Sequence, residues 1–536
     1  MIMKTVMNLW VNFTLSFSVV SACIWNCSAA GDRFGDFRKC LIRTNNSFAS
    51  GVYAPTNSSF SSILQFPIGN VRFKDTNMPK PGIIVTPSGA AEIQAVVVCA
   101  RKVNLHLRVR SGGHDYEGLS YTSGFYDTPF VLVDVSRMRK VSVDVQEKTA
   151  WVESGTTLGE LYYHVGNASR NLGFPGGVCP TVGTGGHISG GGYGAMMRKY
   201  GLAADNVIDA ILVNANGTIL DRELMGEDLF WAIRGGGGNT FGIIVSWKVR
   251  LVYVPNNVTV LKVNRDLGQN ATKLVHKWQY IAPRLPPELF LRVSFLQKNI
   301  GNDSRNRTVE AHFVSTFLGG VKSLISIMDK NFPELGVKKE DCKEMRWVES
   351  VLYFYDLPTE TPELLLNRVH NETTSYKAKA DYVQKPIPEE GLKGLWELLL
   401  EDEAQNLSMD LNPYGGRMDE ISESALPFPH RVGNLYNIQY LVYWSDSNHS
   451  RYIEWSRRVE TFLTPYVSNS PRVAYVNCRD LDVGMNTNGR NTSYEEAVIW
   501  GEKCFKNNFE KLVQVKTKVD PTNFFRNEQS VPPLKN

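Results

Sequence analysis

The 536-residue sequence lacks the signatures of several large classes of protein. No run of lysine and arginine is long enough to form a nucleic-acid-binding surface, and the formal net charge is only +4. Neither a CxxC pair nor a His/Cys zinc pattern occurs, so we expect no structural metal site. The P-loop signature, GxxxxGK followed by Ser or Thr, is absent too, which excludes that mode of phosphate binding.

Long hydrophobic runs are scarce. The one near the start, Leu9 to Trp25, follows Lys4 and precedes small residues at 28–30, which is typical of a secretory signal peptide. Polar residues such as Asn12 interrupt this short run and disfavour the alternative of a membrane anchor. We therefore expect residues 1–30 to be a signal peptide. The mature chain is expected to be soluble, without a membrane span, and secreted or vacuolar.

Twelve N-x-S/T glycosylation sequons follow the predicted signal peptide, which supports the same route through the secretory pathway. They begin at Asn45, Asn57, Asn167, Asn216, Asn257, Asn270, Asn302, Asn306, Asn371, Asn406, Asn448 and Asn491. In an oxidising compartment Cys40 and Cys99 can pair and attach the N-terminal segment to the first domain. Spacing alone leaves this pairing open, but we expect the disulfide.

Glycine is abundant in two stretches whose composition is not that of a flexible linker. Ten of the 31 residues from Pro175 to Asp205 are glycine, yet His187 and Tyr193 are threaded among them. Such segments let backbone N–H groups approach an anionic ligand, so we expect an ordered cradle for a large phosphate-bearing molecule. The run GGGYGA loosely matches a Rossmann fingerprint, but no apolar strand precedes it. A second glycine-rich stretch, RSGGHDYEGLSY, begins at Arg110.

The composition, 43% hydrophobic and 21% charged, is typical of a chain with a large folded core, and its pattern divides it into several regions. A βαβ unit is expected from Pro81 to Arg110. The other expected elements include strands at 130–134, 149–153, 243–250 and 473–477 and helices at 228–233 and 494–515. The expected regions are an N-terminal segment at 31–77, a glycine-rich domain at 78–253, an α+β domain with an antiparallel sheet at 254–470, and a C-terminal segment at 471–536.

Two blocks, RSGGHDYEGLSY and GGVCPTVGTGGHISGGGYG, resemble the covalent flavin-attachment segments of the plant berberine bridge enzyme-like family. The blocks AIRGGGGNTFGII, NPYGGRMDEIS, YVNCRDLD and VDPTNFFRNEQSVPP are similar as well, so the resemblance spans almost the whole mature chain. The sequences of these blocks most resemble those of the cannabinoid oxidocyclases and monolignol oxidoreductases of that family. It implies an α+β fold with a vanillyl-alcohol oxidase-type (PCMH) FAD-binding domain, completed by residues 471–536, and a substrate domain whose antiparallel sheet lies over the flavin.

The resemblance also implies a doubly tethered FAD. His114 matches the residue bonded to the flavin 8α-methyl group and Cys179 the residue bonded at C6, although each alone could be a turn histidine or a buried cysteine. His187 matches a histidine near the flavin pyrimidine that can stabilise the reduced anion, and Val182 lies at the oxygen-gate position. The other residues assigned to FAD are Arg110, Ser111, Gly112, Gly113, Gly118, Gly183, Gly186, Gly190, Gly191 and Ile243.

The substrate side departs from the family pattern. Reticuline-oxidising members have a glutamate base where this chain has Gln439, and monolignol and cannabinoid members have a tyrosine where it has Cys478. The monolignol type also has a lysine where this chain has Asn437. A thiol can act as a base only if its pKa is depressed, and a neutral space-filling role is as good an interpretation. The candidate catalytic residues are Tyr116, Tyr193, Tyr414, Gln439 and Cys478.

Two functions remain open at this stage. The first is an oxidase that uses FAD and O2 on a plant phenolic, prenylated phenolic or alkaloid and releases H2O2. The second is a non-redox, Diels–Alder-type cyclase on the same scaffold, in which Arg292 and Arg417 could polarise a carbonyl or phenol. A non-catalytic flavoprotein or defence antigen is a third alternative. The expected partners are a small-molecule substrate and O2, and the expected state is a monomer.

Overall fold

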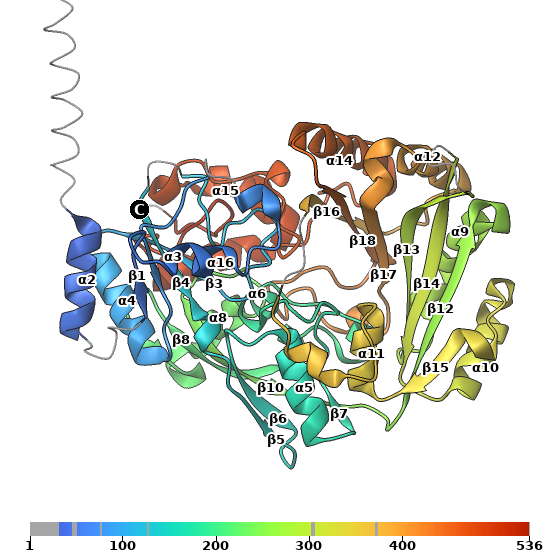
Figure 1. Cartoon of the computed structure of the whole chain (residues 1–536), viewed down its shortest axis with the longest axis horizontal. Helices are drawn as coiled ribbons and strands as arrows, with labels where there is room; N and C mark the ends of the chain where they lie inside the picture. Colours follow the sequence, from blue (N-terminus) through green and yellow to red (C-terminus); the bar gives the residue numbers. More distant parts are fainter. Residues whose placement is uncertain are drawn as a thin grey trace, which may run out of the picture.

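The computed structural model describes residues 32–44, 51–74, 78–125, 128–301, 306–369 and 374–534. The predicted signal peptide lies outside these residues. In Figure 1 the strands from β12 to β18 stand at one side of the molecule, and the earlier strands lie at the other side with the C-terminal helices. None of the helices described is long and apolar enough to cross a membrane.

The first sheet contains the predicted βαβ unit. Its strands, in spatial order, are β1 (Val52–Tyr53), β2 (Ile83–Val85), β4 (Phe130–Asp134) and β3 (His106–Arg110). Helix α4 (Ala90–Lys102) crosses from β2 to β3, and both strands run parallel to β4, which lies between them. Helix α2 (Arg33–Thr44) is joined to α4 by the disulfide Cys40–Cys99, which confirms that prediction.

The second sheet is antiparallel and frames the glycine-rich stretch. It is formed by β5 (Val141–Asp144), β6 (Thr149–Glu153), β10 (Ile243–Arg250), β8 (Val207–Val213) and β9 (Ile219–Leu220), and a small ribbon pairs β7 (Leu172–Gly173) with β11 (Val252–Tyr253). Between β7 and β8 the glycine-rich chain forms two short α-helices, α6 (Thr184–Ser189) and α7 (Met197–Tyr200), and one 3-10 turn at Ala204–Asn206. The cradle is therefore ordered, but most of it has irregular backbone.

Side-chain capping sets the start of the two longer helices beside this sheet. Helix α5 (Leu158–Ala168) begins with a reciprocal capping box between Thr157 and Glu160. Helix α8 (Arg222–Ile233) begins where the Asp221 side chain accepts a hydrogen bond from the Leu224 N–H. The backbone of Gly226 is not helical, with a φ of 67°, so α8 has a kink there and the predicted helix at 228–233 is its second part.

The third sheet has seven antiparallel strands. In spatial order they are β15 (Cys342–Met345), β12 (Val258–Asp266), β14 (Arg307–Phe317), β13 (Leu289–Asn299), β17 (Leu407–Pro413), β18 (Tyr436–Trp444) and β16 (Ser375–Val383). Its outer face packs against α9 (Ala271–Ile281), α10 (Val321–Asn331), α12 (Glu389–Leu399) and α14 (His449–Leu463), as Figure 1 shows. Alternate residues point the other way: Ile438 and Tyr440 join the outer core, whereas Leu441 joins the core shared with the glycine-rich half.

The C-terminal segment corrects two predictions. Residues 473–477 are not a strand: their backbone is irregular, and the Ala474 N–H bonds to the Lys503 carbonyl rather than to a neighbouring strand. The expected single helix at 494–515 is two helices, α15 (Tyr494–Phe505) and α16 (Asn508–Val519). They are separated at Lys506, whose φ of 47° is incompatible with a right-handed helix.

Candidate active site

One cavity is lined by segments that are far apart in the sequence. Most of the lining residues belong to the segments 109–120, 177–193, 238–244 and 475–479, and the others are Val135, Ser154, Leu158, Gln439 from β18 and Asn527. The lining therefore combines both glycine-rich stretches, the irregular C-terminal loop and the inner face of the seven-stranded sheet. The predicted site residues that line it are Ser111, Gly112, Gly113, His114, Tyr116, Cys179, Val182, Gly183, Gly186, His187, Tyr193, Ile243, Gln439 and Cys478.

Two predicted site residues with large side chains lie elsewhere. Arg110 is fully buried and forms an ion pair with Asp134, so its charge is used inside the first sheet. Tyr414 directly follows β17 and packs edge-to-face on Tyr382, with ring centroids 5.8 Å apart. Neither side chain is among the lining residues, so the geometry favours a packing role for Tyr414 over the catalytic role predicted for it.

Three predicted glycines serve the backbone rather than the cavity lining. Gly118 has a φ of +71°, which allows the turn that follows His114. At Gly190 a Cβ atom would lie 2.1 Å from the Asn477 amide, and Gly191 has a φ of +113° beside Phe428. These glycines permit the close approach of the C-terminal loop to the glycine-rich stretch.

Other glycines leave open space that only a ligand would fill. A Cβ at Gly186 would meet no protein atom within 4 Å, and one at Gly238 would meet only Ser189, at 3.9 Å. Neither residue has a left-handed φ, so the backbone does not require glycine there. At Gly112, by contrast, a Cβ would lie 2.3 Å from the Gly183 nitrogen, because the two glycine-rich stretches touch. This open, glycine-walled cavity fits a flavin dinucleotide.

The two residues expected to bond the flavin lie on the same wall. His114 Nε2 is 2.9 Å from the Thr181 hydroxyl oxygen, and Cys179 Sγ is 3.5 Å from the same oxygen. Thr181 therefore lies between the two nucleophiles and contacts both. Sequence reasoning missed Thr181, although it stands inside the quoted block GGVCPTVG.

Gln439 links two of the predicted tyrosines. Tyr193 donates a hydrogen bond to Gln439 Oε1 at 2.7 Å, and Gln439 Nε2 donates to the Tyr116 hydroxyl oxygen at 2.8 Å. Asn437 lies two residues earlier on β18, which places it on the same face of the sheet as Gln439. Its buried amide makes no hydrogen bond to any described residue, although it lies near enough to Tyr193 to oppose the rise in that phenol's pKa.

Burial governs the protonation of the cavity lining. It raises the pKa of the Cys478 thiol far above its usual value, and Asp480 adds to the rise, so this burial disfavours the hypothesis of a thiolate base. Burial also raises the pKa of Tyr116 and Tyr193 well above 10. It lowers the pKa of His187 to about 4, so that imidazole is neutral at pH 7. Its Nε2 accepts a hydrogen bond from the Gly177 N–H, which assigns the ring proton to Nδ1.

The irregular C-terminal loop adds lining residues that sequence reasoning did not single out. They are Tyr475, Val476, Asn477 and Arg479, all within the quoted block YVNCRDLD. Tyr475 is 6% exposed, and its ring packs on Tyr193 with centroids 5.3 Å apart. The resemblance of the whole block YVNCRDLD could have identified them, but only Cys478 within it was considered.

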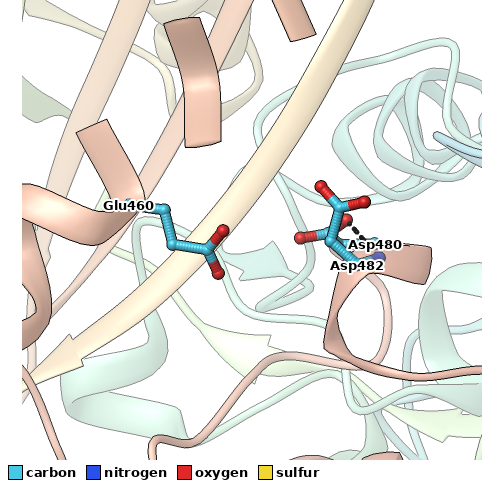
Figure 2. Close-up of side chains that lie close together, drawn as sticks. All are labelled: Glu460, Asp480 and Asp482. Carbon is cyan, nitrogen blue, oxygen red and sulfur yellow. Dashed lines mark hydrogen bonds between the residues drawn. The ribbon is translucent and has the colours of Figure 1, made fainter. Parts of the chain in front are cut away.

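A buried network of charges lies directly behind two lining segments. Lys379 Nζ is 2.6 Å from Glu460, 2.8 Å from Asp480 and 2.9 Å from Asp482, three side chains that Figure 2 shows close together. The Lys379 ammonium thus lies where these carboxylates converge. Lys377 pairs with Asp480 at 2.6 Å and also with Glu117, next to Tyr116. These pairs fix the C-terminal loop and the 114–117 turn to β16.

The two arginines considered for a cyclase do not line the cavity. Arg292 lies 3.7 Å from Asp410 in a part-buried pair. Arg417, in the short helix α13 (Arg417–Glu420), pairs with Glu420 at 2.8 Å on the surface. Their charges are therefore used in ion pairs and not in the cavity lining.

Comparison with known proteins places these features in a family. The family model described as FAD binding domain matches residues 81–222, and the one described as berberine and berberine like matches residues 474–532. Berberine bridge enzyme-like 26 from Arabidopsis thaliana is 51% identical over 508 residues, covering 93% of this chain and 94% of the relative. Cannabidiolic acid synthase-like 2 from Cannabis sativa is 50% identical over 511 residues, covering 93% of each chain.

Solved structures agree with the sequence relatives. The structure of BBE-like #28 from Arabidopsis thaliana has a TM-score of 0.87 and 48% identity, covering 94% of this chain and 100% of that one. Wild-type Phl p 4, a grass pollen allergen described as a glucose dehydrogenase, has a TM-score of 0.86 and 43% identity with the same coverage, and an isoleucine-to-valine variant of it is described as a glucose oxidase. The chain therefore belongs to the berberine bridge enzyme-like family of FAD-linked oxidoreductases.

Proposed function

We propose that this oxidoreductase oxidises, or oxidatively cyclises, a plant phenolic, prenylated phenolic or alkaloid and passes the electrons to O2, which leaves as H2O2. The observation that supports this most directly is one cavity wall that holds His114 and Cys179 beside a group of tyrosines and Gln439. When bound, FAD supplies the acceptor for a hydride from the substrate. In this proposal residues 78–253 and 471–536 bind FAD, and residues 254–470 supply the substrate side.

The chain's own residues have distinct tasks in this proposal. His114 and Cys179 bond the flavin at two positions and so fix its orientation, with Thr181 positioning both side chains. Gln439 holds Tyr116 and Tyr193 by hydrogen bonds, which arranges polar groups over the substrate. Cys478 stays protonated and fills space. Secretion or vacuolar targeting, glycosylation and a monomeric state belong to the same proposal.

Use of O2 is supported by Val182. This residue lines the cavity between Cys179 and Gly183, at the position where the family resemblance places the oxygen gate. Wild-type Phl p 4 is described as a glucose dehydrogenase, and its isoleucine-to-valine variant is described as a glucose oxidase. A small side chain at the gate is expected to let O2 reach the flavin.

A non-redox cyclase is the second candidate, and a specific observation favours it. Family oxidases need a base, and the buried Cys478 and Asn437 supply none. The same cavity would then bind a phenolic substrate without net oxidation.

Anaerobic mixing of the flavin-loaded protein with a panel of phenolic metabolites separates the two candidates. The oxidase predicts substrate-dependent bleaching of the flavin, followed by stoichiometric H2O2 once air is admitted. The cyclase predicts product formation with the flavin oxidised throughout. Val182→Ile is the control for the gate: it should leave the anaerobic bleaching unchanged and slow only the reaction with O2.

A further inference from the structure

Tyr475 differs from the other cavity tyrosines in how its hydroxyl is bonded. Its oxygen accepts a hydrogen bond from the Gly192 N–H at 3.0 Å and another from Asn477 Nδ2 at 3.1 Å. A phenol oxygen has room for two such donors and carries one proton of its own to give. Both acceptor positions of Tyr475 are therefore used by the protein.

The orientation of this phenol is fixed by packing. Its ring lies against Tyr193, and Phe428 contacts it edge-on with centroids 5.6 Å apart. Asn477 is itself held by a hydrogen bond to the His187 carbonyl at 2.9 Å. The two groups that donate hydrogen bonds to the Tyr475 oxygen thus belong to a rigid part of the cavity wall.

The hydroxyl proton of Tyr475 has no acceptor among the described residues, although the residue lines the cavity. The other two cavity tyrosines are bonded differently: Tyr193 donates to Gln439, and the Tyr116 oxygen accepts one hydrogen bond from Gln439, whereas the Tyr475 oxygen accepts two. A hydroxyl whose oxygen is already polarised by two N–H groups is a stronger hydrogen-bond donor than an ordinary phenol. Tyr475 can therefore present its proton to an oxygen atom of a ligand.

The titratable groups nearest Tyr475 are neutral, and the carboxylate that lines the cavity, Asp115, lies beside the Arg479 guanidinium. The titratable groups that face Tyr475 are Cys478, Tyr193, Tyr382 and Tyr414, and burial raises the pKa of each, so all four are neutral at pH 7. Arg479 lines the same cavity with a guanidinium 3.5 Å from Asp115. The pKa of Tyr475 is itself raised to about 12 by burial, and the N–H donors oppose that rise, so it remains a neutral donor.

We propose that Tyr475 is a fixed hydrogen-bond donor to the phenolate oxygen of the substrate, so that the substrate binds already ionised and no protein base is needed. This inference rests on the proposed function, and it explains how a cavity without Glu, Tyr or Lys at the family's base positions can bind a reactive phenol. The phenol proton passes to solvent on binding, and no other bond changes. The flavin carbonyls are the alternative acceptor for the same donor.

The test uses the flavin-loaded protein and 4-nitrophenol, a probe whose phenolate is coloured and which need not be oxidised. Titration of the bound probe against pH gives its pKa in the cavity. In the wild type this pKa should lie below that of the free probe. Tyr475→Phe should raise it by roughly one to two units, the value of one charge-assisted hydrogen bond. Tyr382→Phe, which removes a neighbouring phenol that does not line the cavity, should leave it unchanged.

Two further measurements make each outcome decisive. If Tyr475 donates to the flavin, Tyr475→Phe will shift the flavin midpoint potential without probe and leave the pKa of the bound probe unchanged, which overturns the proposal. Failure of the wild type to bind the phenolate overturns it too. If Tyr475→Phe does not fold, Asn477→Ser removes one of the two donors and should raise the pKa of the bound probe by a smaller amount. The probe is not turned over, so the two hypotheses can fail separately. If Tyr475→Phe shifts the pKa of the bound probe but no phenol bleaches the flavin, the proposed oxidase function is refuted and the role of Tyr475 as a donor stands.

Discussion

The hydroxyl of Thr181 lies between the two residues to which we assign flavin attachment. His114 comes from the turn after β3 and Cys179 from the turn before α6, so they meet only because the glycine-rich stretches touch at Gly112 and Gly183. For Cys478, the sequence identified the residue but not its surroundings. Its burial makes it a poor base, and that could not be known from the sequence.

The first prediction concerns the tethers. In the wild type the flavin should remain with the polypeptide after acid denaturation, because two side chains bond it. His114→Ala and Cys179→Ala should each leave one bond, and the double substitution should leave none. Peptide mass spectrometry measures the adduct at each position. Complete release of flavin from the denatured wild type would show that neither bond exists.

The second prediction rebuilds the family's base. Asn437 and Gln439 lie on the same face of β18, so Cys478→Tyr combined with Asn437→Lys should place a phenol and a cation over the substrate. Anaerobic flavin reduction by substrate should then quicken, since a positioned base contributes about 10²–10⁴-fold. The matched control, Cys478→Phe with Asn437→Met, has similar volume without the ionisable groups. Reduction that stays negligible in the rebuilt variant would favour the cyclase.

At the scale of helices and strands, the sequence predicted most regular elements well. The strands at 130–134, 149–153 and 243–250 begin and end where they were expected, because each is a short apolar or alternating run. The strand expected at 473–477 was wrong for a physical reason: Val473, Ala474 and Val476 are buried by neighbouring helices, not by strand pairing. The break at Lys506 was missed because lysine ordinarily favours a helix.

The third prediction tests the link between α2 and α4. Cys40–Cys99 closes a sequence separation of 59 residues, so it limits the freedom of the unfolded chain. Cys99→Ser combined with Cys40→Ser should destabilise this region by roughly 2–4 kcal/mol. Limited proteolysis at the α2 end should become faster, whereas the flavin spectrum should not change, because neither cysteine lines the cavity. Equal proteolysis rates in the two proteins would contradict a stabilising role.

At the scale of the whole molecule, the site is assembled from segments that the sequence does not place side by side. Gln439 comes from the third sheet, the tethers from the first half of the chain, and Tyr475 from the irregular C-terminal loop. Motif resemblance predicted many of the lining residues, but it could not show which tyrosines share a hydrogen bond. Those contacts depend on how the seven-stranded sheet packs on the glycine-rich half.

The fourth prediction concerns how the C-terminal tail is fixed. Glu528 accepts two hydrogen bonds from Arg108, at 2.8 and 2.9 Å, and both side chains are fully buried. Glu528→Gln keeps the shape but leaves the arginine charge uncompensated, which should cost about 3–5 kcal/mol. The control, Glu420→Gln, breaks an exposed pair and should cost less than about 1 kcal/mol. Thermal midpoints that fall equally in both variants would argue against the tail as a fixed element.

The last prediction follows from three buried histidines, His106, His187 and His430. Burial lowers the pKa of all three, to about 4 for His187 and about 3 for His430, so they stay neutral in the folded chain. In the unfolded chain a histidine titrates near pH 6.5, so below that pH the unfolded state binds more protons and is favoured. Stability contributed by these residues is therefore present above about pH 6.5 and is lost as the pH falls toward 4. Each contributes a slope of about 1.4 kcal/mol per pH unit across that window.

Thermal unfolding at a series of pH values measures this loss. His430→Gln should flatten the fall in the midpoint between pH 6.5 and 4, because one of the three neutral imidazoles no longer takes up a proton on unfolding. His430 stacks on Tyr382 with centroids 4.2 Å apart, so the variant should also start from a lower midpoint at neutral pH. The control His164→Gln changes an exposed residue and should keep the wild-type pH dependence. A midpoint that does not change from pH 7 to pH 5 in the wild type would mean that these imidazoles are not held neutral by the fold.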